Sequence, residues 1–84
     1  MSMADALKDQ GVQQFMQQDY EQAAHTFRQA IDAYEDDGAA DMVAEMQVNL
    51  GLALHMLGQH DEALEQMNMA HAVFAQMGDT SRTA

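Results

Sequence analysis

The sequence predicts an all-α protein built from two antiparallel helical hairpins that stack on each other. Proline is absent, β-branched residues are few, and 15 alanines and nine methionines supply apolar volume in strong helix formers. The chain also repeats itself with a period of about 40 residues. Identical residues stand 40 positions apart at Ala4/Ala44, Gly11/Gly51, Met16/Met56, Ala23/Ala63, Ala30/Ala70 and Gly38/Gly78.

Apolar periodicity predicts two helices in each repeat. The expected helices span residues 3–17, 20–37, 41–57 and 60–77. Gly38, Gly58 and Gly78 each follow such a run, where a glycine in the left-handed conformation ends a helix. Asp19, with Gln22 three residues later, is expected to cap the second helix, and Asp41 is expected to cap the third. Connections this short force neighbouring helices to run antiparallel.

Two glycines lie inside helices, where each costs about 1 kcal/mol relative to alanine. The interval from Gly11 to Ala23 equals the interval from Gly51 to Ala63. When each hairpin closes, we expect the two small residues to meet and to let the helix backbones approach closely. The glycines are therefore predicted to have a packing role.

Composition limits the function classes. Residues 1–84 fit one small domain. The chain has no cysteine, and its net charge of −11 disfavours nucleic acid and anionic lipid while it tolerates basic or neutral protein partners. No leader and no apolar run long enough to span a bilayer is present, which predicts a cytoplasmic protein. No nucleophile motif or phosphate loop points to an enzyme, and the four histidines lack metal-ligand spacing, so neither cofactor nor metal is expected.

The pattern Leu50-Gly51-Leu52-Ala53-Leu54 followed by Asp61-Glu62-Ala63-Leu64, and Gly11 followed by Ala23, Phe27 and Ala30, resembles the tetratricopeptide repeat in its longer, 40-residue variant. The resemblance implies a short α-solenoid. Its first repeat would span residues 3–38 and its second 41–78, with 79–84 as a tail or the truncated start of a further helix. Gln10 and Gln14 would face a preceding repeat, so their polarity predicts that the first repeat is an end unit.

In this family the first helix of each hairpin lines a concave groove, which implies a protein–protein interaction module that binds a peptide or helix of a partner. The groove is predicted at Lys8, Val12, Phe15, Met16, Val48, Asn49, Leu52, His55 and Met56. The alternative is that these residues are ordinary core between helices. Lys8 and Asn49 also match positions that clamp a C-terminal carboxylate in some family members, but an ion pair of Lys8 with Asp5 is the expected role of that lysine.

A second functional reading is structural: self-association, or an array of repeats without a peptide ligand. A face of the last helix would stay uncovered if no further helix followed it, and a homodimer through that helix would cover it. This self-association face is predicted at Leu64, Met67, His71, Phe74 and Met77.

Acidic side chains gather around the turn between the two hairpins. They are Asp32, Glu35, Asp36, Asp37, Asp41 and Glu45. Three of them crowd a helix C-terminus, where the helix dipole disfavours anions, so local stability does not explain them. A basic partner, adaptation to high salt and a merely soluble corner remain as three interpretations.

Overall fold

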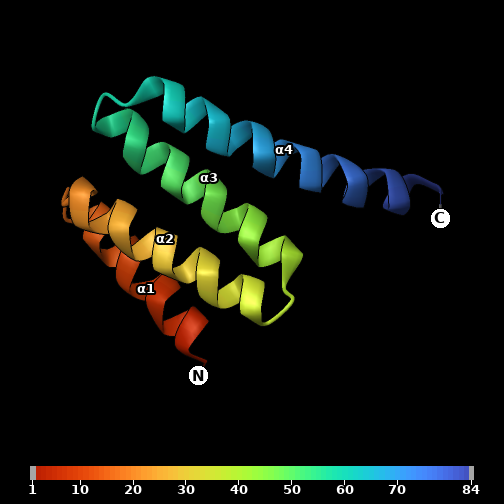
Figure 1. Ribbon diagram of the computed structural model, residues 1–84, viewed down its shortest axis with the longest axis horizontal. Helices are drawn as coiled ribbons and strands as arrows, with labels where there is room; N and C mark the ends of the chain where they lie inside the picture. The colour runs from red at the N-terminus through yellow and green to blue at the C-terminus, as the bar shows by residue number, and fades with distance from the viewer. Residues whose placement is uncertain (1, 84) are drawn as a thin grey trace.

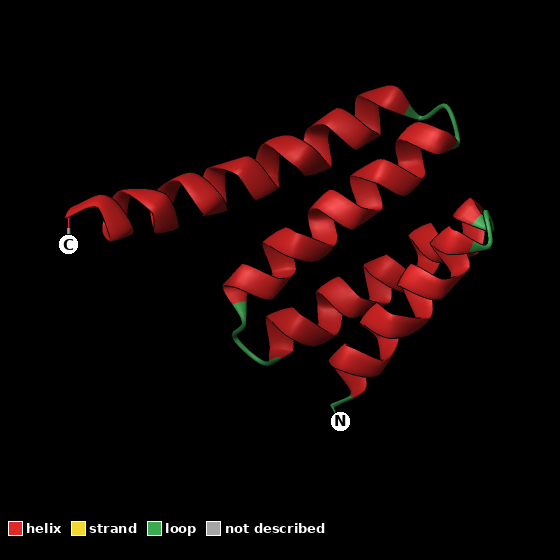
Figure 2. Ribbon diagram, turned by 180° about the vertical axis from the view of Figure 1, so that it is seen from behind, coloured by secondary structure: helices red, strands yellow, loops and turns green. Residues whose placement is uncertain are grey.

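The computed structural model describes residues 2–83, with side chains described for residues 2–78. This part of the chain is all-α and contains no strand (Figures 1 and 2). The helices are α1 (Met3–Met16), α2 (Tyr20–Asp36), α3 (Ala40–Met56) and α4 (His60–Thr83). The predicted fold class, two stacked antiparallel hairpins, is therefore confirmed, with helix starts at or next to those expected.

The helices follow one another in a zigzag (Figure 1). Each helix packs along its neighbours in the sequence, so that α2 contacts both α1 and α3, and α3 contacts both α2 and α4. A zigzag leaves one trough between α1 and α3, with α2 at its base, and another between α2 and α4, with α3 at its base.

The turns within the two hairpins occupy equivalent positions of the repeat and share one geometry. Gly58 has a positive φ of 83°, as expected of a helix-ending glycine, and its counterpart Gln18 also has a positive φ, of 66°. The amide of Gln59 donates to the carbonyl of Leu54, and the amide of Asp19 donates to the carbonyl of Gln14, both at 2.9 Å. Nothing in the sequence indicates that Gln18 adopts this glycine-favoured conformation.

The predicted caps need correction. Asp19 occupies the cap position of α2 but its side chain makes no capping hydrogen bond. Asp41 lies inside the first turn of α3, because that helix begins at Ala40. Ser2 caps α1, because its Oγ accepts the amide of Asp5 at 3.0 Å.

Gly78 does not end the fourth helix as expected. Helix α4 runs on through residues 79–83, which the sequence suggested as a tail or a new helix; Ala84 lies outside the described residues. No proline follows Gly78, and a glycine without a helix-breaking neighbour is tolerated within a helix. With 24 residues against 17 in α3, α4 projects beyond its partner by seven residues, or about 10 Å (Figure 1).

The core is made mainly of alanine. Eight of the 14 buried hydrophobic residues in the described chain are alanines, and the largest fully buried side chains are those of Phe27, Met46, Leu50 and Leu54. Methionine contributes less to the core than its abundance suggested, since Met46 alone among the described methionines is buried. The exposed methionines are Met3, Met16, Met56, Met69 and Met77.

The helical glycines have the predicted packing role, but with larger neighbours than expected. A Cβ added at Gly11 would lie 2.6 Å from the ring of Phe27, and one added at Gly51 would lie 2.8 Å from Cγ of Met67 and 3.2 Å from the carbonyl oxygen of Ala63. The expected meeting of glycine with alanine is thus seen in part in the second hairpin, while in the first the Phe27 side chain occupies the space. Phe27 and Met67 occupy equivalent positions in the two repeats.

Side-chain hydrogen bonds connect α1 to α2. The Tyr34 hydroxyl donates to Oδ1 of Asp5 at 2.5 Å, and the buried Thr26 hydroxyl donates to Oε1 of Gln14 at 2.6 Å. Gln14 therefore faces α2 and not a preceding repeat, whereas Gln10 is exposed. The expected ion pair between Lys8 and Asp5 is not among the ion pairs of the described residues.

We expect Gly11→Ala to lower the free energy of unfolding by about 2 kcal/mol. A Cβ 2.6 Å from the Phe27 ring lies at the upper end of the overpacking cost of about 1–3 kcal/mol, and the gain in helix propensity returns about 1 kcal/mol. Gly78→Ala is the matched control, since a Cβ added at that helical glycine would meet nothing within 4 Å. It should leave stability unchanged or raise it by up to about 1 kcal/mol. Chemical denaturation measures both. A Gly11→Ala variant as stable as wild type would contradict the close approach.

The Asp5–Tyr34 hydrogen bond makes stability depend on pH at both extremes. The bond from Tyr34 lowers the pKa of Asp5 below its ordinary 3.8, so its stabilisation is present above that pH and is lost as pH falls through the lowered pKa. Burial, with the Asp5 bond second, raises the pKa of Tyr34 above 10.0, so that contribution is lost as pH rises beyond 10.0.

Tyr34→Phe should therefore lower Tm at neutral pH and flatten the dependence of Tm on pH at both ends, as a thermal melt across pH would measure. Tyr20→Phe is the control, because no hydrogen bond of the Tyr20 hydroxyl is found among the described residues. Equal pH profiles for wild type and Tyr34→Phe would rule out the coupling.

Candidate functional site

The trough between α1 and α3 contains an apolar hollow of about 120 Å³. Helical spacing places residues 12, 15 and 16 on one face of α1, and residues 49 and 52 lie on the facing side of α3. The lining residues are Val12, Phe15, Met16, Phe27, Asn49 and Leu52. Five of these six belong to the predicted groove, so the structure brings together side chains from both repeats. We call this hollow the α1–α3 groove.

The groove walls are accessible while the base is closed. Met16 is 76% exposed, and Val12 and Leu52 are 38% and 43% exposed, whereas the Phe27 ring beneath them is 1% exposed. These three exposed wall residues are therefore not ordinary core, whereas Phe15 packs against the core cluster, as the alternative interpretation expected. Asn49 is the polar side chain of the lining, and its Nδ2 makes only a long contact of 4.0 Å with the sulfur of Met46. Its amide remains able to bind a peptide backbone group.

Four predicted groove residues do not line the hollow. They are Lys8, Val48, His55 and Met56. Lys8 and Val48 are half-buried, and Met56 is exposed towards the end of α3. Since Lys8 does not line the hollow with Asn49, the arrangement lacks the cation that a carboxylate clamp would need.

Phe27 is the groove residue that sequence reasoning missed. It comes from α2, the second helix of the hairpin, and reaches the groove because Gly11 leaves room for its ring. The spacing from Gly11 to Phe27, repeated from Gly51 to Met67, was the available signal. Phe15 also packs edge-on against Tyr20, with ring centroids 5.1 Å apart, which fixes this wall of the groove.

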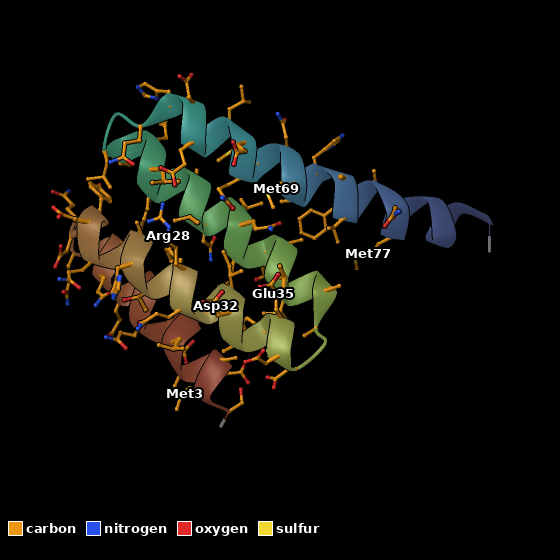
Figure 3. The ribbon with its side chains drawn as sticks, in the orientation of Figure 1. Met3, Arg28, Asp32, Glu35, Met69 and Met77 are labelled. Atoms are coloured by element: carbon orange, nitrogen blue, oxygen red, sulfur yellow. The ribbon has the colours of Figure 1, made fainter. Side chains whose placement is uncertain are left out.

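The predicted self-association face is largely open. Leu64 is 61% exposed, Phe74 is 40% exposed and Met77 is 43% exposed, and His71 is also exposed. Met67 differs, because it is half-buried against Gly51. Met77 lies where α4 runs out beyond α3 (Figure 3).

Two histidines meet at the α3–α4 turn. Nδ1 of His55 and Nδ1 of His60 are 2.9 Å apart, so in the neutral pair one ring donates and the other accepts. The two rings provide two ligands, and no group of three or more potential metal ligands occurs among the described residues.

The described helices include none with the length and hydropathy to cross a bilayer.

The six acidic residues around the α2–α3 turn are all exposed, and Asp32 and Glu35 lie on the side of α2 that faces α4 across α3 (Figure 3). Comparison of the chain with known protein families, with curated proteins and with solved structures finds no match.

Proposed function

We propose that this chain is a protein–protein interaction module that resembles the tetratricopeptide repeat and binds a peptide or helix of a partner in the α1–α3 groove. The observation that carries the proposal is the convergence of Val12, Phe15 and Met16 with Asn49 and Leu52 around one accessible apolar hollow. Cores bury such side chains, and an exposed cluster with one amide at its edge favours a ligand that is mostly apolar.

The size of the groove suggests the ligand. A cavity of about 150 Å³ holds a benzene molecule. The 120 Å³ hollow is somewhat smaller, so it suits one aliphatic anchor such as leucine or methionine. Met16 has three rotatable side-chain bonds and can repack around different anchors. Asn49 would then fix the peptide backbone beside the anchor. The groove thus favours one buried anchor over a long, specific sequence.

Selection from a pool of random dodecapeptides tests this proposal. Peptides retained by the wild-type protein should share one large apolar residue, and their binding should be lost in Leu52→Glu, which places a charge in the groove wall. Leu64→Glu is the matched control, since it adds the same charge to an exposed leucine on α4. We expect the control to bind within about twofold of wild type and Leu52→Glu to bind at least about 30-fold more weakly. Equal loss in both variants would refute the groove as the binding site.

A second function, self-association through α4, is favoured by a comparison between the repeats. Ala24 and Tyr34 on α2 are each 3% exposed, but their counterparts Leu64 and Phe74 on α4 are 61% and 40% exposed. Helix α3 packs on α2, whereas no described helix follows α4. A second copy of the chain is one occupant that would cover these positions.

Sedimentation at several protein concentrations tests self-association. If α4 forms a dimer interface, the wild-type mass should rise with concentration, and the double variant Leu64→Ser, Phe74→Ser should remain monomeric. Met3→Ser is the control, because Met3 is 76% exposed on α1, away from α4. A wild-type chain that stays monomeric throughout would exclude this second function and leave the groove proposal intact.

A further inference from the structure

The trough between α2 and α4 contains an open hollow of about 350 Å³ that shares no residue with the α1–α3 groove. Figure 3 shows Arg28, Asp32 and Glu35 on α2 and Met69 on α4 along its two sides. Its lining consists of Arg28, Ile31, Asp32, Glu35, Gln47, Leu50, Gln66 and Met69. The hollow therefore combines carboxylates, amides and apolar side chains.

An unsatisfied acceptor lies at the base of this hollow. Gln47 on α3 is 6% exposed, and its Oε1 is buried without a hydrogen-bond partner. A buried polar atom normally has a partner, and leaving one unpaired is costly. Half a turn of the Gln47 amide would exchange Oε1 with Nε2, so that the acceptor faces a donor in the hollow and Nε2 takes the buried position. The observation points to a ligand that carries N–H groups.

The charges on the α2 side point to a cation. Arg28 is paired with Glu62 on α4, which neutralises it, while no ion pair joins Asp32 or Glu35 to a described residue. These two carboxylates stand three residues apart on one face of α2, where they repel each other. Glu35 also lies in the last turn of α2, where the helix dipole disfavours an anion. A cation between them would relieve both effects.

We propose that the α2–α4 hollow binds an arginine side chain of a protein partner. A guanidinium carries five N–H donors in a plane, enough for Gln47 Oε1 and for both Asp32 and Glu35 together. The apolar surface of Leu50 and Met69 suits the aliphatic stem and the weakly hydrated flat face of arginine better than it suits a strongly hydrated ammonium. The net charge of −11 would attract a basic partner towards it.

Titration by NMR with the acetylated, amidated peptide Ala-Arg-Ala tests the site, with the lysine and citrulline peptides as comparisons. The arginine peptide should shift the side-chain amide signals of Gln47 saturably and bind more tightly than the lysine peptide, with the uncharged citrulline peptide weakest. Leu52→Glu should leave this binding unchanged, which separates the hollow from the proposed groove. Absence of a saturable shift, or equal affinity for all three peptides, would overturn the proposal.

Two charge variants separate a built site from general attraction to an acidic protein. Asp32→Asn with Glu35→Gln removes two charges from the hollow, and Asp36→Asn with Asp37→Asn removes two from the neighbouring turn, outside the lining. The first pair should weaken the arginine peptide about tenfold and the second by less than about twofold. Equal weakening by both pairs would mean that only the net charge attracts the peptide.

Gln47→Met tests the buried acceptor, since methionine has nearly the same shape and lacks the amide. We expect this variant to keep or raise Tm, because the unpaired oxygen is gone, and to bind the arginine peptide several-fold more weakly. Binding as tight as that of wild type would show that the amide takes no part and would overturn the site as proposed.

Discussion

The close approach of the helices within each hairpin depends on a helical glycine, Gly11 in the first hairpin and Gly51 in the second, because glycine has no side chain. At Gly11 the vacant position is filled by the Phe27 ring, and at Gly51 by the Met67 side chain. The Phe27 ring thereby reaches the space between α1 and α3, where it forms the base of the α1–α3 groove. One packing constraint thus sets the distance between two helices and also places the residue that closes the candidate binding site from below.

An alanine-rich interior has a second effect on function. Because most core positions hold the smallest apolar side chain, the core has little need for the larger ones, and methionine and leucine side chains remain on the surface. They gather along the edges of the zigzag, at the α1–α3 groove and on α4. Acidic residues gather around the α2–α3 turn and also occur elsewhere on the surface, and Arg28–Glu62 is the ion pair found between described residues. Apolar patches separated by negative charge favour association at chosen faces over general aggregation.

Much of the fold could be predicted from the sequence, because the 40-residue repeat and the glycines at 38 and 58 mark the helices and turns directly. The prediction that Gly78 ends the fourth helix was wrong. A glycine ends a helix only where the residues after it are also non-helical, and none of residues 79–83 is a helix breaker.

Five groove residues were predictable because they come from equivalent helices at equivalent positions. Phe27 was not, because its place in the groove depends on how far its ring reaches past α1. The α2–α4 hollow was harder to foresee, since three helices contribute residues of no shared chemical type. Gln47, at a position where an apolar residue is expected, was its one available sign.

Gln18 bears on how the hairpins are held. A residue with a side chain in the left-handed conformation is disfavoured by about 1–2 kcal/mol, yet Gln18 adopts the backbone shape that Gly58 adopts in the second hairpin. The packing of α1 against α2 therefore fixes the conformation of this turn, and the turn sequence does not determine how the two helices pack. Such a link tolerates a poorly suited residue, so a turn of this shape can form where no glycine marks it.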